Sequence, residues 1–335
     1  MTATATRALA LGDALARLRD PGALEAFSAV AGEPLLAVDL DGDPGDAAVP
    51  IALAQLAAPT VALVRDPAAP AAQRFAAHFD VVVASETELG CLDAAVRANP
   101  IASAVLVQLL RFGNARTIEA GLVAESLAYA ALQAGPEFRA WLAARSVAPP
   151  PRAEPGAPLR VRRDGASLQL TLDRPAKRNA YSAALRDALV EALQLAASDD
   201  TLARVVLDGA GAAFCAGGDL DEFGAAPDPA TAHAIRTTRS AARLLASLRD
   251  RIEVRVHGAC VGAGIELAAF AARVVAREDA WFQLPEVAMG LIPGAGGTVS
   301  LPRRIGRQRT AWLALSGARL DAATALRWRL VDAIE

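Results

Sequence analysis

Residues 254–298 read VRVHGACVGAGIELAAFAARVVAREDAWFQLPEVAMGLIPGAGGT, and this stretch decides both the fold and the candidate site. The strand-like run Val254–Val256 enters a turn of small residues, Gly258–Gly264, and an apolar helix follows with Glu266 in its first turn. Small residues let a ligand approach the backbone closely, and the amides that open a helix are free donors with a positive partial charge. The turn therefore predicts backbone donors for a developing negative charge.

The second half of the stretch adds another acid. A short strand, Arg273–Ala276, leads to a loop that carries Glu286, and a glycine-rich turn follows at Pro293–Gly297. Two carboxylates beside backbone donors suit proton transfer next to a carbonyl group, because the donors stabilise an enolate while the acids move protons. The alternative is an ordinary strand, turn and helix with both glutamates on the surface.

Length and composition exclude several classes of protein. The 335 residues allow two domains and a large core, and the 53% hydrophobic and 21% charged residues fit a globular protein. The net charge of -3 provides no basic surface for nucleic acid. We therefore expect no nucleic-acid partner.

Cysteine, histidine and hydropathy patterns indicate the compartment. The three cysteines form no CxxC pair and are too few for a disulfide framework, and the three histidines lie too far apart for metal-site spacing. Charged residues interrupt the Ala-rich N-terminus, and no later run is long enough to cross a membrane. We expect a cytoplasmic protein with no metal and no membrane partner.

Residues 1–147 have the pattern of a mixed α/β domain that becomes helix-rich towards its end. Strand-like runs at Leu35–Leu40, Thr60–Val64 and Asp80–Ala84 precede a helical part. Its expected helices are Ile101–Phe112, Ile118–Gln133 and Glu137–Arg145. The Pro-rich run at 148–158 (APPPRAEPGAP) predicts a linker, so the expected domains are 1–147 and 159–335.

The first domain resembles part of the second. Residues 59–86 align with residues 252–279 at a constant shift of 193 without a gap. The small-residue turn is not repeated, because Gly258–Gly264 falls on Arg65–Ala71, which contains no glycine. We interpret residues 1–147 as a degenerate copy that kept its strands and lost its chemistry. The alternative is that two Ala/Val-rich units are alike in composition only.

Residues 159–335 alternate strands and helices. Leu159–Arg163 and Ser167–Leu172 predict a hairpin, and Ser182 is the expected N-cap of a helix at Ala183–Ala197. Further elements are expected at Leu202–Leu207 (strand), His233–Leu248, Leu301–Ser316 and Asp321–Leu330 (helices). The alternation predicts an α/β fold.

A second turn repeats the arrangement of the first. CAGGD (Cys215–Asp219) also places glycines after a strand, and two such turns can aim two backbone amides at one oxygen. Several runs in residues 159–335 then resemble the crotonase (enoyl-CoA hydratase/isomerase) family, in the family's order. They are RPAKRNAYS, AFCAGGDLDEF, VHGACVGAGIELAA, FQLPEVAMGLIPGAGGT, LPRRIG and ALSGARLDAATALRWRLVD.

The resemblance implies the family's ββα superhelix and roles for particular residues. The backbone N–H groups of Gly218 and Ala263 would form the oxyanion hole for a CoA thioester carbonyl, although the family usually has glycine where Ala263 stands. Glu266 and Glu286 match the two family carboxylates. In hydratases of this family, one of the two deprotonates water for attack at C3, and the other delivers a proton to C2.

Other matching positions imply contacts to the substrate and its CoA part. The alternatives without a ligand contact are that Lys177 and Arg178 are solvated loop charges, that Asp219 caps a helix, and that Gly294 serves the geometry of its turn alone. These positions are Lys177, Arg178, Ala180, Ala216, Asp219, Leu220 and Gly294.

The expected activity is that of an enoyl-CoA hydratase, because both carboxylates are present and double-bond isomerases of the family often keep only one. The alternatives are an enoyl-CoA isomerase, hydrolase, decarboxylase or cofactor-independent dioxygenase of the same fold, or a non-catalytic acyl-CoA-binding subunit. The expected substrate is an acyl-CoA thioester, with no further cofactor. The family usually assembles as trimers or dimers of trimers, which implies a homo-oligomer.

The ends of the sequence depart from the family pattern. Family members usually continue past the position of residues 329–332 with helices that pack on a neighbouring core, whereas this sequence ends at Glu335. Helices of similar character lie earlier, at 98–111 and 121–145. We expect these earlier helices to cover the second domain, in cis or across a subunit contact.

Overall fold

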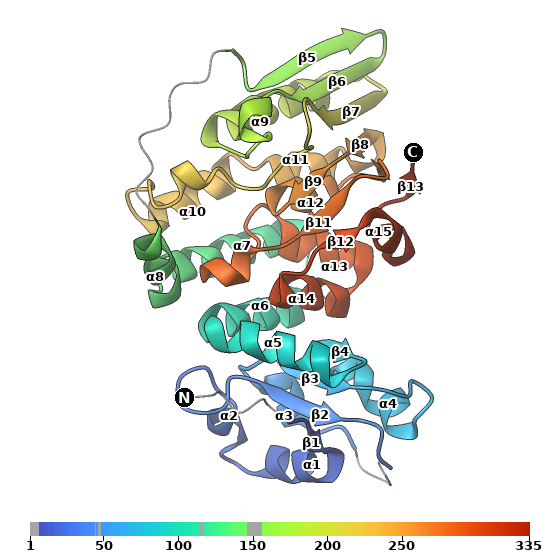
Figure 1. The fold of residues 1–335 in the computed structure, drawn as a ribbon. Helices are drawn as coiled ribbons and strands as arrows, with labels where there is room; N and C mark the ends of the chain where they lie inside the picture. Colours follow the sequence, from blue (N-terminus) through green and yellow to red (C-terminus); the bar gives the residue numbers. More distant parts are fainter. Residues whose placement is uncertain (1–6, 44, 46–47, 114–116, 146–155) are drawn as a thin grey trace.

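The computed structural model describes residues 7–43, 45, 48–113, 117–145 and 156–335. A small sheet lies at one end of the molecule and a larger sheet at the other, with helices of the N-terminal half between them (Figure 1). The predicted linker, residues 148–158, falls mostly outside the described residues. The division into two domains and a linker therefore stays a prediction.

The N-terminal sheet is all parallel, and both of its faces are buried. Its strands follow the order β1 (Leu9–Ala10), β2 (Leu36–Asp39), β3 (Thr60–Leu63) and β4 (Val81–Val83). Successive residues of a strand point to opposite faces, so Leu36 and Ala37 enter two different cores. This explains why the strands read as continuous apolar runs without alternation.

Short helices cover one face of this sheet and form a small core of their own with it. They are α1 (Leu11–Arg19), α2 (Ala23–Ala26), α3 (Ile51–Gln55), α4 (Pro70–Phe75) and the 3-10 turn η1 (Ala76–His78). Phe75 is among the largest fully buried side chains of the described chain. Burying an aromatic side chain of this size contributes about 2 kcal/mol.

The other face of the sheet shares its core with the rest of the protein. Four helices lie between this face and the second half: α5 (Glu86–Ala98), α6 (Pro100–Gly113), α7 (Ile118–Gln133) and α8 (Pro136–Ala144). Leu63 of β3, Leu106 of α6 and Val299 of the second half belong to one continuous cluster. Residues far apart in the sequence therefore fold around a common interior.

A buried ion pair network fastens the two halves together. Asp80, with 1% of its surface exposed, accepts hydrogen bonds from Arg111 (Nε to Oδ1, 2.8 Å) and from Arg307 (Nη1 to Oδ1, 2.7 Å). Arg307 also donates to the carbonyl of Phe79 (3.0 Å). A buried carboxylate needs such partners, because an unpaired charge in the interior is strongly destabilising.

The second half builds two sheets by repeating strand, strand and helix. The six-stranded sheet has the order β13-β10-β8-β7-β6-β5, in which only the β5–β6 hairpin is antiparallel. Its strands are β5 (Leu159–Asp164), β6 (Ser167–Leu172), β7 (Arg204–Gly209), β8 (Ile252–Val256), β10 (Arg273–Ala276) and β13 (Ala333–Ile334). The smaller sheet has the order β12 (Leu320–Asp321), β11 (Trp281–Gln283) and β9 (Ala259–Val261).

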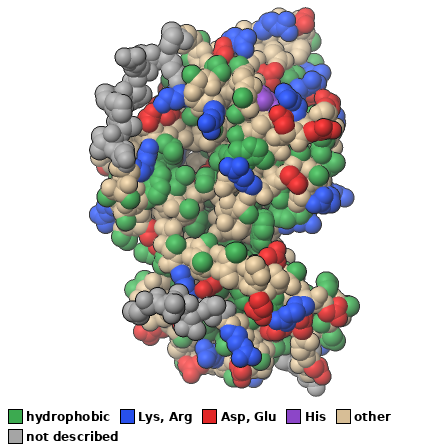
Figure 2. All heavy atoms as spheres, in the orientation of Figure 1, with side chains coloured by type: hydrophobic (Ala, Val, Ile, Leu, Met, Phe, Trp, Pro, Cys, Tyr) green, Lys and Arg blue, Asp and Glu red, His purple; other side chains and the backbone are tan. Residues whose placement is uncertain are grey.

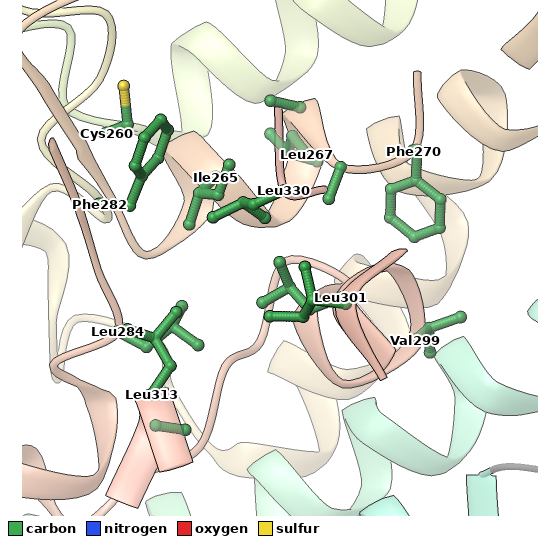
Figure 3. Packing of buried hydrophobic residues seen from close by; sticks show 14 of the residues in the cluster. Cys260, Ile265, Leu267, Phe270, Phe282, Leu284, Val299, Leu301, Leu313 and Leu330 are labelled. Atoms are coloured by element: carbon green, nitrogen blue, oxygen red, sulfur yellow. The ribbon is translucent and has the colours of Figure 1, made fainter. Parts of the chain in front are cut away.

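In the successive units β8–β9 and β10–β11 one strand joins each sheet before a helix follows, whereas the hairpin β5–β6 lies wholly in the six-stranded sheet. The helices are α9 (Ala183–Ser198), α10 (Pro229–Thr238), α11 (Ala241–Ser247), α12 (Ala263–Ala268), α13 (Gly297–Ile305), α14 (Arg307–Ser316) and α15 (Ala322–Trp328). The 3-10 turns are η2 (Pro175–Lys177), η3 (Leu220–Glu222), η4 (Arg249–Arg251) and η5 (Glu286–Met289). Figure 3 shows Ile265 and Leu267 of α12 on one side of the core, facing Leu301 of α13.

The predicted α/β fold is confirmed, and so are most of the predicted elements. Ser182 caps α9 as expected, since its hydroxyl accepts the amide of Leu185 at 3.2 Å. The single helix predicted at His233–Leu248 was wrong. The helix α10 ends at Thr238, and α11 begins at Ala241 because the hydroxyl of Ser240 caps it by accepting the amide of Arg243 at 3.2 Å.

The predicted helix at Leu301–Ser316 is also two helices. α13 begins four residues earlier than predicted and ends at Ile305, and Gly306 with φ of 83° separates it from α14. The strands β9 and β11 were not predicted, because three-residue strands carry little periodic signal.

Over the face drawn in Figure 2, Lys and Arg side chains are interspersed with Asp and Glu side chains. In the described part of the chain no single helix has the length and hydropathy to cross a membrane; α5 and α6 pass that test only as a pair, across a bend of 108°.

Candidate active site

The turn between β9 and α12 presents a free backbone donor. Gly262 has φ of 48° and ψ of -120°, a conformation that only glycine adopts without strain, and it turns the chain into α12 at Ala263. The first amides of a helix have no partner within the helix. The amide of Ala263 donates to no other residue that the structure describes, so it is available to a ligand.

The second predicted turn lies beside the first. Cys215 pairs with Cys260 of β9 in a parallel bridge, and the amide of Val261 donates to the carbonyl of Cys215 at 3.0 Å. A Cβ added to Gly217 would lie 3.2 Å from the carbonyl oxygen of Val261. The amide of Gly218, like that of Ala263, has no hydrogen-bond acceptor among the residues described.

Both free amides border a cavity of about 250 Å³. The apolar wall of the cavity includes Phe223, whose ring would lie 2.8 Å from a Cβ at Gly218. The polar groups that line the cavity come from separate elements, which is typical of a small-molecule site. They include Glu125, Ser126, Asp219, Glu266 and Glu286.

Glu266 is held by the glycine-rich turn that precedes α13. Its side chain is buried, and its Oε2 accepts the amides of Ala295 (2.7 Å) and Gly297 (2.9 Å). A Cβ at Gly297 would lie 2.6 Å from Cγ of Glu266, so this glycine makes room for the acid. Burial raises the pKa of Glu266 well above its usual range, and the nearby carboxyl group of Glu286 raises it further.

Glu286 approaches the first turn from the opposite side and is much less restrained. A Cβ at Gly262 would lie only 2.3 Å from its Oε1, so the absence of a side chain there lets the acid reach the turn. Its Oε2 is buried without any hydrogen-bond partner among the residues described. Burial raises the pKa of Glu286 to about 8. A carboxyl group in this state is protonated at neutral pH and can donate that proton.

The sequence did not predict that α7 lines the cavity. Glu125, Ser126 and Tyr129 line it, together with the two predicted acids. Burial raises the pKa of Glu125 to about 7 and that of the Tyr129 phenol well above its usual range. A sequence signal existed, because Glu125 interrupts an apolar stripe at helical spacing between Leu122 and Leu132.

Gly294 borders the cavity, and the structure gives a physical reason for the glycine. A Cβ at Gly294 would lie 2.5 Å from two ring carbons of Tyr129. Its backbone does not have positive φ, so the turn itself would tolerate another residue. The glycine is needed because α7 packs directly against it.

The positions predicted to contact CoA are dispersed. Of these, Asp219 borders the cavity, but its carboxylate bonds to Arg174 (Nη2 to Oδ2, 2.8 Å) and caps η3. Lys177 pairs with Asp221. Arg178, Ala180, Ala216 and Leu220 do not border the cavity, nor does Lys177. Contacts of these residues to CoA stay a prediction.

The cavity also has a basic side. Arg236 lies over the ring of Tyr129, 4.7 Å from its centroid, and donates to the hydroxyl of Ser126 at 3.0 Å. The Nε of Arg243 is buried and has no partner among the described residues. The described residues contain no group of three or more His, Cys, Asp or Glu side chains arranged to hold a metal ion.

Comparisons with known proteins identify the family to which the second half is similar. A family model described as enoyl-CoA hydratase/isomerase matches residues 162–335. The 2,3-dehydroadipyl-CoA hydratase of Escherichia coli is 41% identical over 172 residues, which are 51% of this chain and 67% of that protein. The 1,2-epoxyphenylacetyl-CoA isomerase of Escherichia coli is 38% identical over 169 residues, 49% of this chain and 64% of that protein.

Solved structures match the same half. An enoyl-CoA hydratase/isomerase from Mycobacterium paratuberculosis superposes with a TM-score of 0.50 at 32% identity, over 54% of this chain and 73% of that one. An enoyl-CoA hydratase from Bacillus anthracis does so with a TM-score of 0.50 at 30% identity, over 53% and 70%. These likenesses confirm the fold predicted for the second half. The chain spans about two thirds of the length of the curated relatives named above.

Proposed function

This chain belongs to the enoyl-CoA hydratase/isomerase family, and from that premise we propose that it adds water to a 2-enoyl-CoA thioester. The observation that carries the proposal is the cavity itself. Two backbone amides without an acceptor among the described residues face the same space as two glutamates from different elements, the buried Glu266 and the half-buried Glu286. A protein that only binds acyl-CoA has no use for two acids in one cavity.

The two amides would act on the thioester carbonyl. As the double bond is attacked, negative charge collects on the carbonyl oxygen, and the N–H groups of Gly218 and Ala263 would hold it. Donors fixed in this way contribute about 3 kcal/mol each to the transition state. Ala263 serves as well as glycine, because the donor is the backbone and not the side chain.

The hydrogen bonds divide the work between the two acids. The amides of Ala295 and Gly297 favour the ionised form of Glu266 and oppose the burial that raises its pKa, so we assign this residue as the base. Glu286 has no such donors at its Oε2, and burial keeps it protonated, which makes it the acid. The pair together then holds one proton in its active state.

Water adds across the C2–C3 double bond of the substrate in two stages. Glu266 takes a proton from water while the water oxygen bonds to C3, the C2–C3 π electrons move towards the carbonyl, and an enolate forms. Glu286 then gives its proton to C2, and the carbonyl re-forms as the charge leaves the oxygen. Glu266 is now protonated and Glu286 ionised, so one proton must return between them before the next turnover. The step forms a C–O bond and a C–H bond at the expense of the C2–C3 π bond and one O–H bond of water, and it needs no cofactor beyond the CoA of the substrate.

Isomerisation of the double bond is the second candidate, because a relative named as an isomerase is 38% identical to this chain. Moving a double bond removes a proton from one carbon and returns it to another, which one acid can do alone. Two acids on separate elements support hydration more strongly, because one can hold water while the other protonates carbon.

The test is hydration of crotonyl-CoA by the full chain and by two variants. Glu266→Gln and Glu286→Gln should each lower kcat by about 10²–10⁴, the range for loss of a general acid or base. Binding of a saturated acyl-CoA should change little, because the amides and the apolar walls remain. Glu119→Gln, at an exposed position of α7, is the matched control and should behave as the parent. Full turnover by either active-site variant would exclude the proposed roles.

A further inference from the structure

Four successive amides at the start of α13 are shared between two carboxylates in alternation. The amides of Ala295 and Gly297 donate to Oε2 of Glu266. The amides of Gly296 and Thr298 donate to Glu125, at 2.7 Å to Oε1 and 2.9 Å to Oε2. Neither carboxylate could move far without releasing the segment that binds the other.

Glu125 reaches this segment from the N-terminal half of the chain. It lies on α7, outside the residues that the family model matches, and only 2% of its surface is exposed. Its Oε2 also accepts the hydroxyl of Thr298 at 2.6 Å. Helix N-termini stabilise anions through their free N–H groups and the helix dipole, and here the anion is a side chain of the same protein.

The packing around Glu125 fixes α7 against the segment. Tyr129, one turn along α7, lies against Gly294, where a Cβ would meet its ring at 2.5 Å. One turn earlier, a Cβ at Gly121 would lie 2.9 Å from Cγ2 of Val299. These contacts leave no room for a side chain on either glycine, so the helix and the segment are fitted to each other along their length.

We propose that Glu125 is a positioning residue for the reaction: it holds the segment Ala295–Thr298, and through that segment it sets the orientation of Glu266. The N-terminal half thus completes the active site of the second half within one chain. This inference rests on the proposed function in one respect, namely that Glu266 acts as the base. Glu125 itself need not touch the substrate.

The position of Glu125 also adds charge to the cavity. Glu125 interacts electrostatically with Glu266 of α12, Glu286 of η5, Tyr129 of α7 and Arg236 of α10. The other charged groups that line the cavity are Arg186, Asp219, Glu222, Arg239 and Arg243. Its negative charge raises the pKa of both Glu266 and Glu286. Removing that charge should therefore lower both pKa values, and both limbs of the pH–rate profile should move to lower pH.

The decisive variant is Glu125→Gln, which keeps the shape of the side chain. The amide oxygen of glutamine can accept one backbone N–H, but its NH2 group faces the other donor and cannot accept it. We expect kcat to fall by about 10²-fold, the cost of displacing a catalytic group by about 1 Å, with KM nearly unchanged. We also expect the alkaline limb of the pH–rate profile to move to lower pH, which a general loss of stability would not produce.

A second measurement does not depend on activity. Hydrogen exchange of the amides at residues 295–298 should become at least about tenfold faster in Glu125→Gln, because a hydrogen bond to a charged group is lost. Glu119→Gln, exposed on the same helix, should leave this exchange unchanged. If Glu125→Gln does not fold, Thr298→Val removes only the hydroxyl bond and should produce the same changes at a smaller size.

These measurements separate the two proposals. Unchanged exchange and an unchanged kcat in a folded Glu125→Gln variant would overturn the positioning role, whatever reaction the protein catalyses. Faster exchange in a protein that hydrates no enoyl-CoA would support the positioning role and reject the proposed function. A fall in kcat of Glu125→Gln without any movement of the pH–rate profile and without any change in hydrogen exchange would also overturn the proposal.

Discussion

Two strand–turn–helix units, one after β3 and one after β9, differ in whether the backbone amides of the turn have hydrogen-bond acceptors within the protein. After β3, the amides of Arg65 and Asp66 both donate to Oδ1 of Asp41, at 3.0 Å and 3.2 Å. At the turn into α12, the amide of Ala263 has no acceptor among the described residues. The first turn is satisfied internally, and the second is left open for a ligand.

The side chains at the two turns follow the same contrast. Arg65 binds the carboxylates of Asp39, Asp41 and Glu86, and its guanidinium group lowers the pKa of Asp41 below the usual range. Glu266 and Glu286 have no cationic partner among the described residues, and burial raises their pKa values. A strand end filled with ion pairs is inert, whereas glycines and unpaired acids leave groups that can react.

The largest effect should follow removal of residues 1–159, the part of the chain that contains the first of these turns. A chain that starts at Arg160 lacks α7 and its Glu125, and it exposes apolar residues of α13 such as Val299, which is buried in the full chain. Arg307 also loses its buried partner Asp80. We expect an aggregated or inactive product, measured by size-exclusion chromatography and by hydration of crotonyl-CoA. A soluble, fully active fragment would show that residues 1–159 contribute nothing to the site.

The next effect should come from making the open turn resemble the closed one. Gly262→Ala places a Cβ 2.3 Å from Oε1 of Glu286 and forces alanine into a backbone conformation reserved for glycine. We expect kcat to fall by about 10²-fold, because Glu286 must move. Thermal unfolding should show a loss of about 1–3 kcal/mol from the strain.

Gly90→Ala is the matched control for this change. Gly90 lies in α5 with open space where a Cβ would be, so alanine should keep full activity and should not destabilise the protein. Normal hydration by Gly262→Ala would mean that Glu286 does not need its approach to the turn.

A smaller and graded effect is the pH dependence of the parent protein. Glu286 must be protonated to donate to C2, and its raised pKa is about 8. Activity should therefore decline as pH rises through about 8, by tenfold for each further pH unit. In the proposed mechanism the decline on the acid side reports protonation of Glu266. A rate that stays constant up to pH 10 would reject Glu286 as the acid.

The smallest effect should come from opening the inert turn. Arg65→Met removes the cation from Asp39, Asp41 and Glu86, all of which are partly exposed to water. Exposed ion pairs contribute little, so the melting temperature should fall only slightly, and kcat should not change. A loss of hydration activity would show that the two turns are coupled through the core.

Much of this contrast could be predicted from the sequence. Glycines before an apolar helix identified the open turn, and the position of Glu266 in the first turn of α12 followed from its spacing to Gly262. The strands β2, β3 and β4 were predicted because buried parallel strands form continuous apolar runs, whereas the two-residue strand β1 was not predicted. That residues 1–147 are a degenerate copy of the second half stays a prediction, although β3 and β4 do fall on β8 and β10 at the shift of 193.

What the sequence did not show are contacts between distant segments. Glu125 binds Gly296 and Thr298, 171 and 173 residues away, and no local pattern encodes such a pair. The break in the helix at Ser240 was missed because apolar spacing continued across it, while the capping serine was the only local signal. Short strands such as β9 were missed because their pairing partners, and not their own residues, define them.

The most direct test of the proposed hydration is to run the reaction with crotonyl-CoA in water labelled with oxygen-18 and to measure the mass of the product by mass spectrometry. The two-acid, two-amide cavity predicts a 3-hydroxyacyl-CoA that carries one labelled oxygen, formed by the parent protein and almost absent with Glu266→Gln. A product without the label, or equal labelling by both proteins, would contradict it.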